Sequence, residues 1–222
     1  MKLILFGPPG AGKGTQAKLM TDKLKLVHIS TGDILRSEVK NNTELGQEAK
    51  GYMNSGKLVP DSLVTEMVRK RLQQEDVEKG FILDGFPRTE SQAKALDGML
   101  VGGIDKAIYL STSEKVVVQR LTGRRVCPKC GTNYHLINMP PKKDMICDQC
   151  QVALFQRPDD NEATVTNRLN VYLKESSAVL EYYRKQNKLE DISGDIDSQE
   201  VFEIISKKIA ALLHEARFNE TK

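Results

Sequence analysis

Short apolar runs alternate with segments of helical spacing along this chain. After the first run, Ala17, Met20 and Leu24 recur at the three- to four-residue interval of one helix face. Five runs have the length and apolar content of buried strands: KLILF (2–6), LVHIS (26–30), FILD (81–84), KAIYL (106–110) and LEDIS (189–193). Strands that alternate with helices pair in parallel, because each crossover connection contains a helix. The pattern predicts an α/β fold with a five-stranded parallel sheet and helices on both faces.

Two segments interrupt this alternation. Residues 30–59 contain two short helical patterns, DILRSEVK and ELGQEAKGYMNSG, which predict a small helical insertion. Residues 124–161 contain the four cysteines and a double proline but few apolar runs, so they predict a second insertion. The last segment contains a long helical stretch (162–186) and an amphipathic helix (198–216). The predicted division is core (1–29), helical insertion (30–59), core (60–123), cysteine insertion (124–161) and core (162–222).

The composition is typical of a globular protein with one main core. The chain has 222 residues, of which 39% are hydrophobic and 28% are charged, and a single core can serve up to ~250 residues. A net charge of +3 argues against non-specific nucleic-acid binding as the main activity. The apolar runs are shorter than the ~20 residues of a membrane span, and the first is too short for the ~7–15-residue core of a signal peptide. We expect a cytoplasmic protein without a nucleic-acid or membrane partner.

A glycine-rich loop separates the first predicted strand from the first predicted helix. GPPGAGKGT (7–15) has the spacing of a phosphate-binding loop, with Gly7, four residues, Gly12 and Lys13. Its backbone N–H groups would surround an anion at the positive end of the helix dipole. Lys13 would reach the β- and γ-phosphates of a nucleotide. The expected loop contacts come from six consecutive residues: Gly10, Ala11, Gly12, Lys13, Gly14 and Thr15.

The phosphate loop departs from the general motif at its metal-binding position. The residue after the lysine is Gly14, where the motif has a Ser or Thr hydroxyl for Mg²⁺, and the hydroxyl comes one place later at Thr15. Asp84 ends the third predicted strand, where a carboxylate can hold the water shell of the metal. We therefore expect Mg²⁺ to contact Asp84 through water.

The four cysteines predict a structural metal site. They form C-x-x-C, sixteen residues and C-x-x-C, the spacing of a tetrahedral zinc site: Cys127, Cys130, Cys147 and Cys150. Four thiolates leave zinc no open position for water, so the site would not be catalytic. Disulfides are disfavoured in a reducing compartment, whereas iron stays an alternative, because a thiolate shell does not select the metal. The histidines lack ligand spacing and are interpreted as surface or packing residues: His28, His135 and His214.

Six motifs occur in a fixed order over about residues 1–195. They are GPPGAGKGTQ (7–16), STGDILR (30–36), LVPD (58–61), DGFPRTESQ (84–92), GRRVC (123–127) and RPDD (157–160). In this order they resemble the bacterial adenylate kinases that have a long, zinc-binding lid. The resemblance implies a phosphate-loop NTPase fold, a monomer, and reversible phosphoryl transfer from Mg-ATP to AMP that yields two ADP. The helical insertion would then bind the nucleoside monophosphate, and the cysteine insertion would be the lid.

Arginines suit such a reaction, because a guanidinium group binds two phosphate oxygens in a geometry that lysine cannot copy. The resemblance assigns Lys13 and Arg124 to ATP, together with the backbone of the phosphate loop. Three arginines would bridge the phosphates of both substrates: Arg88, Arg157 and Arg168. Further ATP contacts are expected from Arg120, Asn133, Tyr134 and the backbone near Ile196.

The resemblance also implies where the acceptor nucleotide binds. Its expected residues are Thr31, Gly32, Arg36, Lys57, Leu58, Val59, Gly85, Phe86, Pro87, Arg88, Gln92, Arg157 and Arg168. The Gln92 amide can both donate to and accept from an adenine edge, and its offset of four residues from Arg88 predicts that both lie on one helical face. Related pyrimidine nucleotide kinases commonly carry Ala where this chain has Thr31. AMP is therefore the expected acceptor.

Three other functions stay open from the sequence. A kinase for CMP or UMP would keep nearly every motif. A kinase for another small acceptor would keep the phosphate loop but leave TGDILR, GFPR and Gln92 unexplained. A zinc-ribbon protein that binds nucleic acid and uses ATP as a switch is disfavoured by the near-neutral charge, by the lack of aromatics among basic residues near the cysteines, and by two nucleotide-site motifs where a switch needs one.

Overall fold

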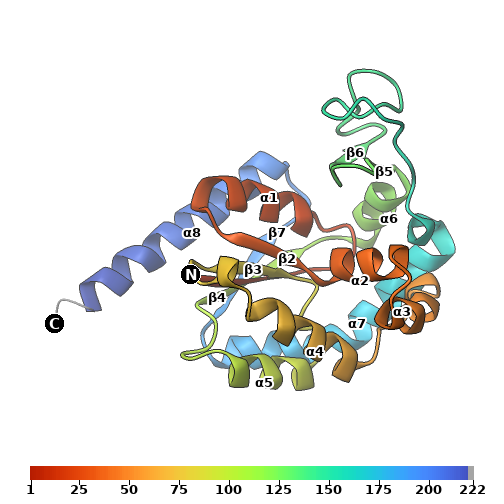
Figure 1. Ribbon diagram of the computed structural model, residues 1–222. Coiled ribbons are helices and arrows are strands. Elements are labelled where there is room, and N and C mark those ends of the chain that lie inside the picture. The colour runs from red at the N-terminus through yellow and green to blue at the C-terminus, as the bar shows by residue number, and fades with distance from the viewer. Residues whose placement is uncertain (220–222) are drawn as a thin grey trace.

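A parallel sheet lies between two layers of helices in the computed structural model, which describes residues 1–219 (Figure 1). The five strands follow the spatial order β2-β3-β1-β4-β7, and every neighbouring pair is parallel. This arrangement confirms the predicted α/β class, and each strand lies within one residue of its predicted bounds. The strands are β1 (Lys2–Phe6), β2 (Val27–Ser30), β3 (Phe81–Asp84), β4 (Lys106–Ser111) and β7 (Leu189–Ser193).

The central strand β1 shows why the strand segments are continuous apolar runs. Successive side chains of a strand point to opposite faces, and here both faces are covered by helices. Leu3 and Leu5 pack with α1 (Lys13–Leu24) and α8 (Ser198–Asn219) on one face. Ile4 and Phe6 pack on the other face, which is covered by α4 (Asp61–Leu72), α5 (Glu90–Met99) and α7 (Glu162–Lys185) (Figure 1).

Helix α8 continues beyond the sheet and away from the body of the molecule (Figure 1). Residues 220–222, at the end of the predicted core segment 162–222, lie outside the described residues, and nothing is described of the side chain of His214. Across residues 1–219, none of the helices combines the length and apolar character that crossing a membrane requires.

The predicted helical insertion consists of two short helices that pack against each other. Helix α2 (Thr31–Lys40) begins at Ser30, whose side chain accepts a hydrogen bond from the Asp33 N–H and so caps the helix. Helix α3 (Glu44–Asn54) is capped in the same way by Thr43. A Cβ at Gly46 would overlap the backbone of Glu38, so the close approach of the two helices requires glycine there.

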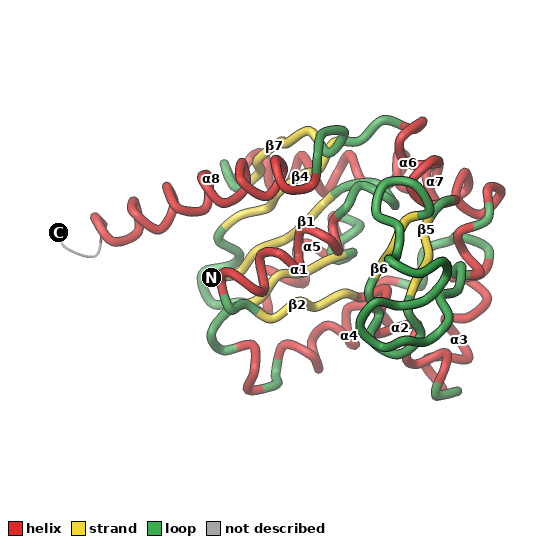
Figure 2. The backbone as a smooth tube through the Cα atoms, turned by 90° about the horizontal axis from the view of Figure 1, so that it is seen from above, coloured by secondary structure: helices red, strands yellow, loops and turns green. Residues whose placement is uncertain are grey.

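The predicted cysteine insertion follows α6 (Glu114–Thr122). It contains a two-stranded antiparallel sheet of β5 (Arg124–Val126) and β6 (Asn133–His135), and it ends in the short 3-10 helix η2 (Pro158–Asp160). A second 3-10 helix, η1 (Glu75–Val77), connects α4 to β3 in the core. Figure 2 shows the cysteine insertion at the same end of the central sheet as α2 and α3. Both insertions therefore lie toward the carboxyl ends of the parallel strands, where α/β proteins place their ligands.

Candidate active site

The phosphate loop leaves β1 in the middle of the sheet and starts α1. Gly12 is the N-cap of α1 and has φ +90°, a left-handed conformation that glycine adopts without strain. Lys13 folds back under the loop, where its Nζ donates to the carbonyl oxygens of Gly7 at 2.8 Å and Pro8 at 3.0 Å. Burial lowers the pKa of Lys13 to about 8, although the charge of Asp84 acts in the opposite direction.

Asp84 lies beside this loop, as the sequence predicted for a residue at the end of β3. A Cβ on Gly14 would lie 3.8 Å from its Oδ2, and His28 Nε2 lies 3.4 Å from the same oxygen. Burial opposes the ionised form of Asp84, but the hydrogen bond with His28 and the charge of Lys13 outweigh it, so the pKa of Asp84 lies below its usual value. His28, interpreted from the sequence as a surface or packing residue, thus lies against a carboxylate of the site. Its contact arises from the parallel pairing of β2 with β3.

A large cleft of about 680 Å³ lies between the phosphate loop and the cysteine insertion. Its size is in the range of ligand sites for small molecules, which is ~300–1,000 Å³. His135, also interpreted from the sequence as a surface or packing residue, lines it too. The structure brings together at this cleft all of the residues predicted to contact ATP: Gly10, Ala11, Gly12, Lys13, Gly14, Thr15, Arg120, Arg124, Asn133, Tyr134 and Ile196.

A smaller cavity of about 80 Å³ lies between the helical insertion and the loop after β3. Most residues predicted for the acceptor line it: Thr31, Gly32, Arg36, Lys57, Leu58, Val59, Gly85, Arg88, Gln92 and Arg168. Arg157 instead lines the large cleft. Phe86 is fully buried in the main core, so its side chain supports the loop, and the Phe86–Pro87 peptide bond is cis.

The two cavities share part of their lining. Three arginines occur in both linings, namely Arg36, Arg88 and Arg168, together with two glycines, Gly32 and Gly85. Guanidinium groups bind phosphate oxygens in pairs, and glycine leaves room for close approach of a ligand to the backbone. The shared wall is therefore suited to hold phosphate groups that enter from either side.

Two carboxylates outside the set of predicted site residues, Asp159 and Asp160, pair with arginines of the site. Arg124 donates to both oxygens of the fully buried Asp160, from Nε at 2.8 Å and from Nη2 at 2.5 Å. Arg168 Nη1 donates to Asp159 Oδ2 at 2.8 Å. The motif RPDD places both carboxylates directly after the predicted phosphate-binding Arg157, which marks them as residues near the site but does not identify their partners.

Asp33 joins the two insertions in a similar way. Its Oδ1 lies 2.5 Å from Nη2 of Arg36 in α2 and 3.7 Å from Nη2 of Arg157 in the cysteine insertion. Burial and neighbouring guanidinium groups lower the pKa of Arg157 and Arg168 to about 10, so both carry a full positive charge at neutral pH. The site therefore concentrates positive charge, which these acidic side chains partly balance.

Gln92 is placed differently from the prediction. Helix α5 begins at Glu90 with Thr89 as its N-cap, so Arg88 precedes the helix and shares no helical face with Gln92. The Thr89 hydroxyl accepts a hydrogen bond from the Gln92 N–H, so the helix begins after Thr89 and Arg88 stays in the extended segment before it. The link between the two residues is instead a hydrogen bond of 2.7 Å from the Arg88 backbone N–H to Oε1 of Gln92.

The sequence is similar to proteins of one known family. A sequence model of the family described as "Adenylate kinase" matches residues 5–188. The chain belongs to the adenylate kinase family. It is 52% identical to an adenylate kinase of Alkaliphilus oremlandii over 91% of this chain and 95% of that protein. It is 50% identical to the adenylate kinases of Methanocella arvoryzae (90% of this chain, 94% of that protein) and Archaeoglobus fulgidus (98% and 100%).

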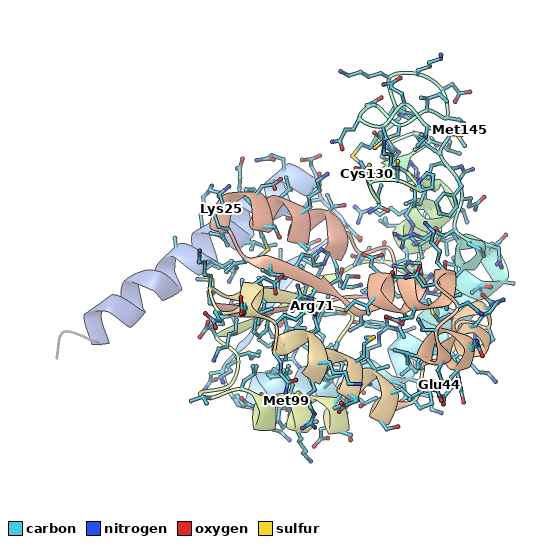
Figure 3. All side chains as sticks on the ribbon, in the orientation of Figure 1. Lys25, Glu44, Arg71, Met99, Cys130 and Met145 are labelled. Atoms are coloured by element: carbon cyan, nitrogen blue, oxygen red, sulfur yellow. The ribbon has the colours of Figure 1, made fainter. Side chains whose placement is uncertain are left out.

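The cysteine insertion of this family member gathers its four thiols in one place. All four Sγ atoms lie within 4.8 Å of one another, and those of Cys130 and Cys147 are 3.8 Å apart. Four sulfurs at ~2.3 Å from one zinc ion are about 3.8 Å apart in a tetrahedron, so the arrangement fits a structural zinc ion. Backbone N–H groups of Cys130 and Cys150 donate to the sulfurs of the preceding cysteines. Figure 3 shows Cys130 within this insertion.

Tyr134 belongs to the thiol cluster as well as to the cleft. Its hydroxyl lies 3.5 Å from Sγ of Cys147 and accepts a hydrogen bond of 2.9 Å from the Asp148 N–H. The ring is nearly fully buried in the small core of the insertion. The predicted contact between Tyr134 and ATP is therefore not one that its hydroxyl is placed to make.

Proposed function

We propose that the chain transfers the γ-phosphoryl group of Mg-ATP reversibly to AMP, which yields two ADP. The observation that carries the proposal is the wall of Arg36, Arg88 and Arg168 shared by the two cavities. A donor in the large cleft and an acceptor in the small cavity would meet with their phosphates at this wall. Membership of the adenylate kinase family supports the same reaction.

The donor would lie with its phosphates on the loop that begins α1. The backbone N–H groups over Gly10–Thr15 and the Lys13 ammonium would hold the β- and γ-phosphates. Arg120 and Arg124 line the same cleft from α6 and β5, and Ile196 lines it beside the start of α8. These residues would fix the triphosphate and place the adenine between α8 and the cysteine insertion.

The acceptor would lie between the helical insertion and the start of α5. Arg36 and Arg88 would bind its phosphate, while Thr31, Val59 and Gln92 would enclose the base. Arg157 and Arg168 would neutralise the charge that spreads over the transferred phosphoryl group. The main contribution of the protein is alignment of an attacking AMP oxygen in line with the γ-phosphorus of ATP.

Two metal ions are part of this proposal. Mg²⁺ would arrive with ATP and keep water ligands, one of which would contact Asp84, and it supplies charge neutralisation between the β- and γ-phosphates. Zinc would be held by Cys127, Cys130, Cys147 and Cys150, and its contribution is to stabilise the fold of the insertion. Both fits rest on donor atoms that the chain itself provides.

We further propose that residues 30–59 and 124–161 close over the bound substrates as two moving parts. Gly123 and Asn161 border the second part and would act as its hinges. Closure would exclude water, which would otherwise compete with AMP for the phosphoryl group. The family resemblance leads us to infer a cytoplasmic monomer, which size-exclusion chromatography with light scattering would test.

A coupled assay with ATP and each of AMP, GMP, CMP and UMP tests the proposed reaction. We expect ADP formation with AMP to exceed that with the other three acceptors at least tenfold in kcat/KM. Comparable turnover with CMP or UMP would instead assign the chain to the pyrimidine nucleotide kinases. Omission of Mg²⁺ should abolish turnover with every acceptor.

A matched pair of variants tests the arginine wall itself. Arg88→Lys keeps the charge but loses two-pronged binding of a phosphate, so we expect kcat/KM for AMP to fall roughly 10²-fold. Arg69→Lys is the control, because Arg69 is half-exposed on α4 and pairs with Glu66. Equal activity of both variants would contradict the assignment of Arg88 to the phosphates.

A further inference from the structure

Asp61 in the first turn of α4 holds a group in the acceptor cavity that it does not itself line. Its Oδ1 accepts a hydrogen bond of 2.7 Å from Nε2 of Gln92. Its Oδ2 accepts a hydrogen bond of 2.6 Å from the Thr89 hydroxyl. The contacts join α4 to the start of α5, and the Gln92 side chain that they hold is buried.

The chemistry of these contacts fixes which end of the Gln92 amide is oxygen and which is nitrogen. An ionised carboxylate has only acceptors, so the atom that faces Asp61 must be the donor Nε2. On the other side, the Arg88 backbone N–H can only donate, so the atom that faces it at 2.7 Å must be Oε1. Both partners therefore favour the same orientation of the amide. In a flipped amide, Nε2 would face the Arg88 N–H, donor against donor, and Oε1 would face the Asp61 carboxylate, acceptor against acceptor.

The orientation of an amide decides which purine it can recognise. Adenine presents a donor at its 6-amino group and an acceptor at N1, whereas guanine presents an acceptor at O6 and a donor at N1. An amide that places Oε1 against position 6 and an Nε2 hydrogen against position 1 pairs with adenine. The same amide rotated by 180° pairs with guanine instead. The amide has one N–H and one oxygen lone pair left after its contacts with Asp61 and Arg88.

We infer that Asp61 is a positioning residue that locks the Gln92 amide in the orientation for a 6-aminopurine and so excludes a 6-oxopurine acceptor. The inference rests on the proposed function, because Gln92 must face the acceptor base. Thr89 helps to hold Asp61 in place, since its hydroxyl donates to the second carboxylate oxygen. Its position as N-cap also fixes the start of α5, which carries Gln92. Asp61 acts through Gln92 and does not touch the nucleotide.

The variant Asp61→Asn tests this inference. Asparagine keeps the size of the side chain but offers a donor as well as an acceptor. A flipped Gln92 amide could then accept a hydrogen bond from the new Asn side chain, and only its contact with the Arg88 backbone N–H would be lost. A two-point contact with a base is worth roughly 10- to 100-fold in discrimination. We expect the ratio of kcat/KM for AMP to that for GMP to fall at least tenfold in coupled assays, while KM for ATP stays within twofold. The change should come mainly through KM for the acceptor.

Glu90→Gln is the matched control. Glu90 also lies in the first turn of a helix near the cavity, but its carboxylate pairs with Lys94 and leaves the Gln92 amide alone. The control should keep the AMP-to-GMP ratio of the wild type. A plain structural effect of Asp61→Asn would lower the melting temperature or reduce turnover of both acceptors alike, and the ratio would not move.

An unchanged ratio in a folded Asp61→Asn protein would overturn the inference while leaving the proposed reaction intact. Failure of the wild type to prefer AMP would instead remove the proposed function. If Asp61→Asn does not fold, Thr89→Val is the second variant, because it frees Oδ2 of Asp61. It should lower the AMP-to-GMP ratio about threefold, and Thr89→Ser, which keeps the hydroxyl, should restore it. A ratio unchanged by Thr89→Val would then count against the inference.

Discussion

Lys13 shows at the scale of one residue how burial sets the chemistry of the site. Its ammonium group donates to the Gly7 and Pro8 carbonyls beneath the phosphate loop, and burial lowers its pKa to about 8. Below that pH the side chain is a cation that attracts the phosphates of ATP. Above it, a growing fraction of the protein must bind a proton before it can make the same contact.

The affinity for ATP should therefore fall as the pH rises through about 8. We expect the Kd for ATP, measured by calorimetry at constant Mg²⁺, to rise up to about tenfold between pH 7.5 and 9, because roughly nine in ten Lys13 side chains are neutral one unit above their pKa. Lys13→Arg is the control, since a guanidinium stays charged over this range. The assignment would fail if both proteins gave the same pH profile.

Other residues of the site depend on partners that lie far away in the sequence. Asp160 pairs with Arg124 across 36 residues, and His28 meets Asp84 across 56. The sequence indicated the arginines and Asp84, because each lies in a recognisable motif. It gave no sign of the specific pairs, because an isolated carboxylate or imidazole is more often a surface group.

At the scale of elements, the cysteine insertion has very little core of its own. Its buried apolar cluster contains Cys127, Tyr134, Cys147 and Leu154, so two of its four members are predicted metal ligands. Leu136, Ile137, Met139 and Phe155 are exposed. A segment with so little burial needs a further source of stability, and a bound metal supplies folding free energy directly.

Removal of the metal should thus affect stability more than chemistry. We expect a chelator to lower the melting temperature by roughly 6–12 °C, as for a loss of about 3 kcal/mol in a chain of this size, while activity at low temperature changes less than threefold. Calorimetry and coupled assays on one sample give both numbers. Metal analysis before chelation distinguishes zinc from iron. Complete loss of activity at an unchanged melting temperature would contradict a structural metal.

At the scale of the whole molecule, the helical insertion is joined to the long helix α7. Nδ2 of Asn167 donates to the Ser55 carbonyl oxygen at 2.5 Å, across 112 residues. A Cβ at Gly56 would lie 2.9 Å from Cγ of Arg168, so the insertion packs directly on a predicted phosphate-binding residue. The acceptor cavity of about 80 Å³ is smaller than typical ligand sites, so the proposed binding of AMP would require the insertion to move away from α7.

The hydrogen bond of Asn167 should favour the closed position of the insertion. A neutral hydrogen bond contributes about 0.5–1.5 kcal/mol, so Asn167→Ala should raise KM for AMP roughly two- to tenfold and leave KM for ATP unchanged. Asn170→Ala is the matched control, because Asn170 is an exposed asparagine on the same helix. An unchanged KM for AMP in the folded Asn167→Ala variant would show that the contact does not bias closure.

Features that depend on local spacing were determined by the sequence itself. The five apolar runs, the phosphate loop and the paired C-x-x-C knuckles follow from periodicity, backbone requirements of glycine and ligand spacing, all of which act over a few residues. The tertiary structure decided what crossover connections bring together. It brought His28 to Asp84, paired Asp159 and Asp160 with arginines, and placed Asp61 within hydrogen-bonding distance of Gln92. These contacts join residues 9 to 56 positions apart, and no local periodicity encodes them.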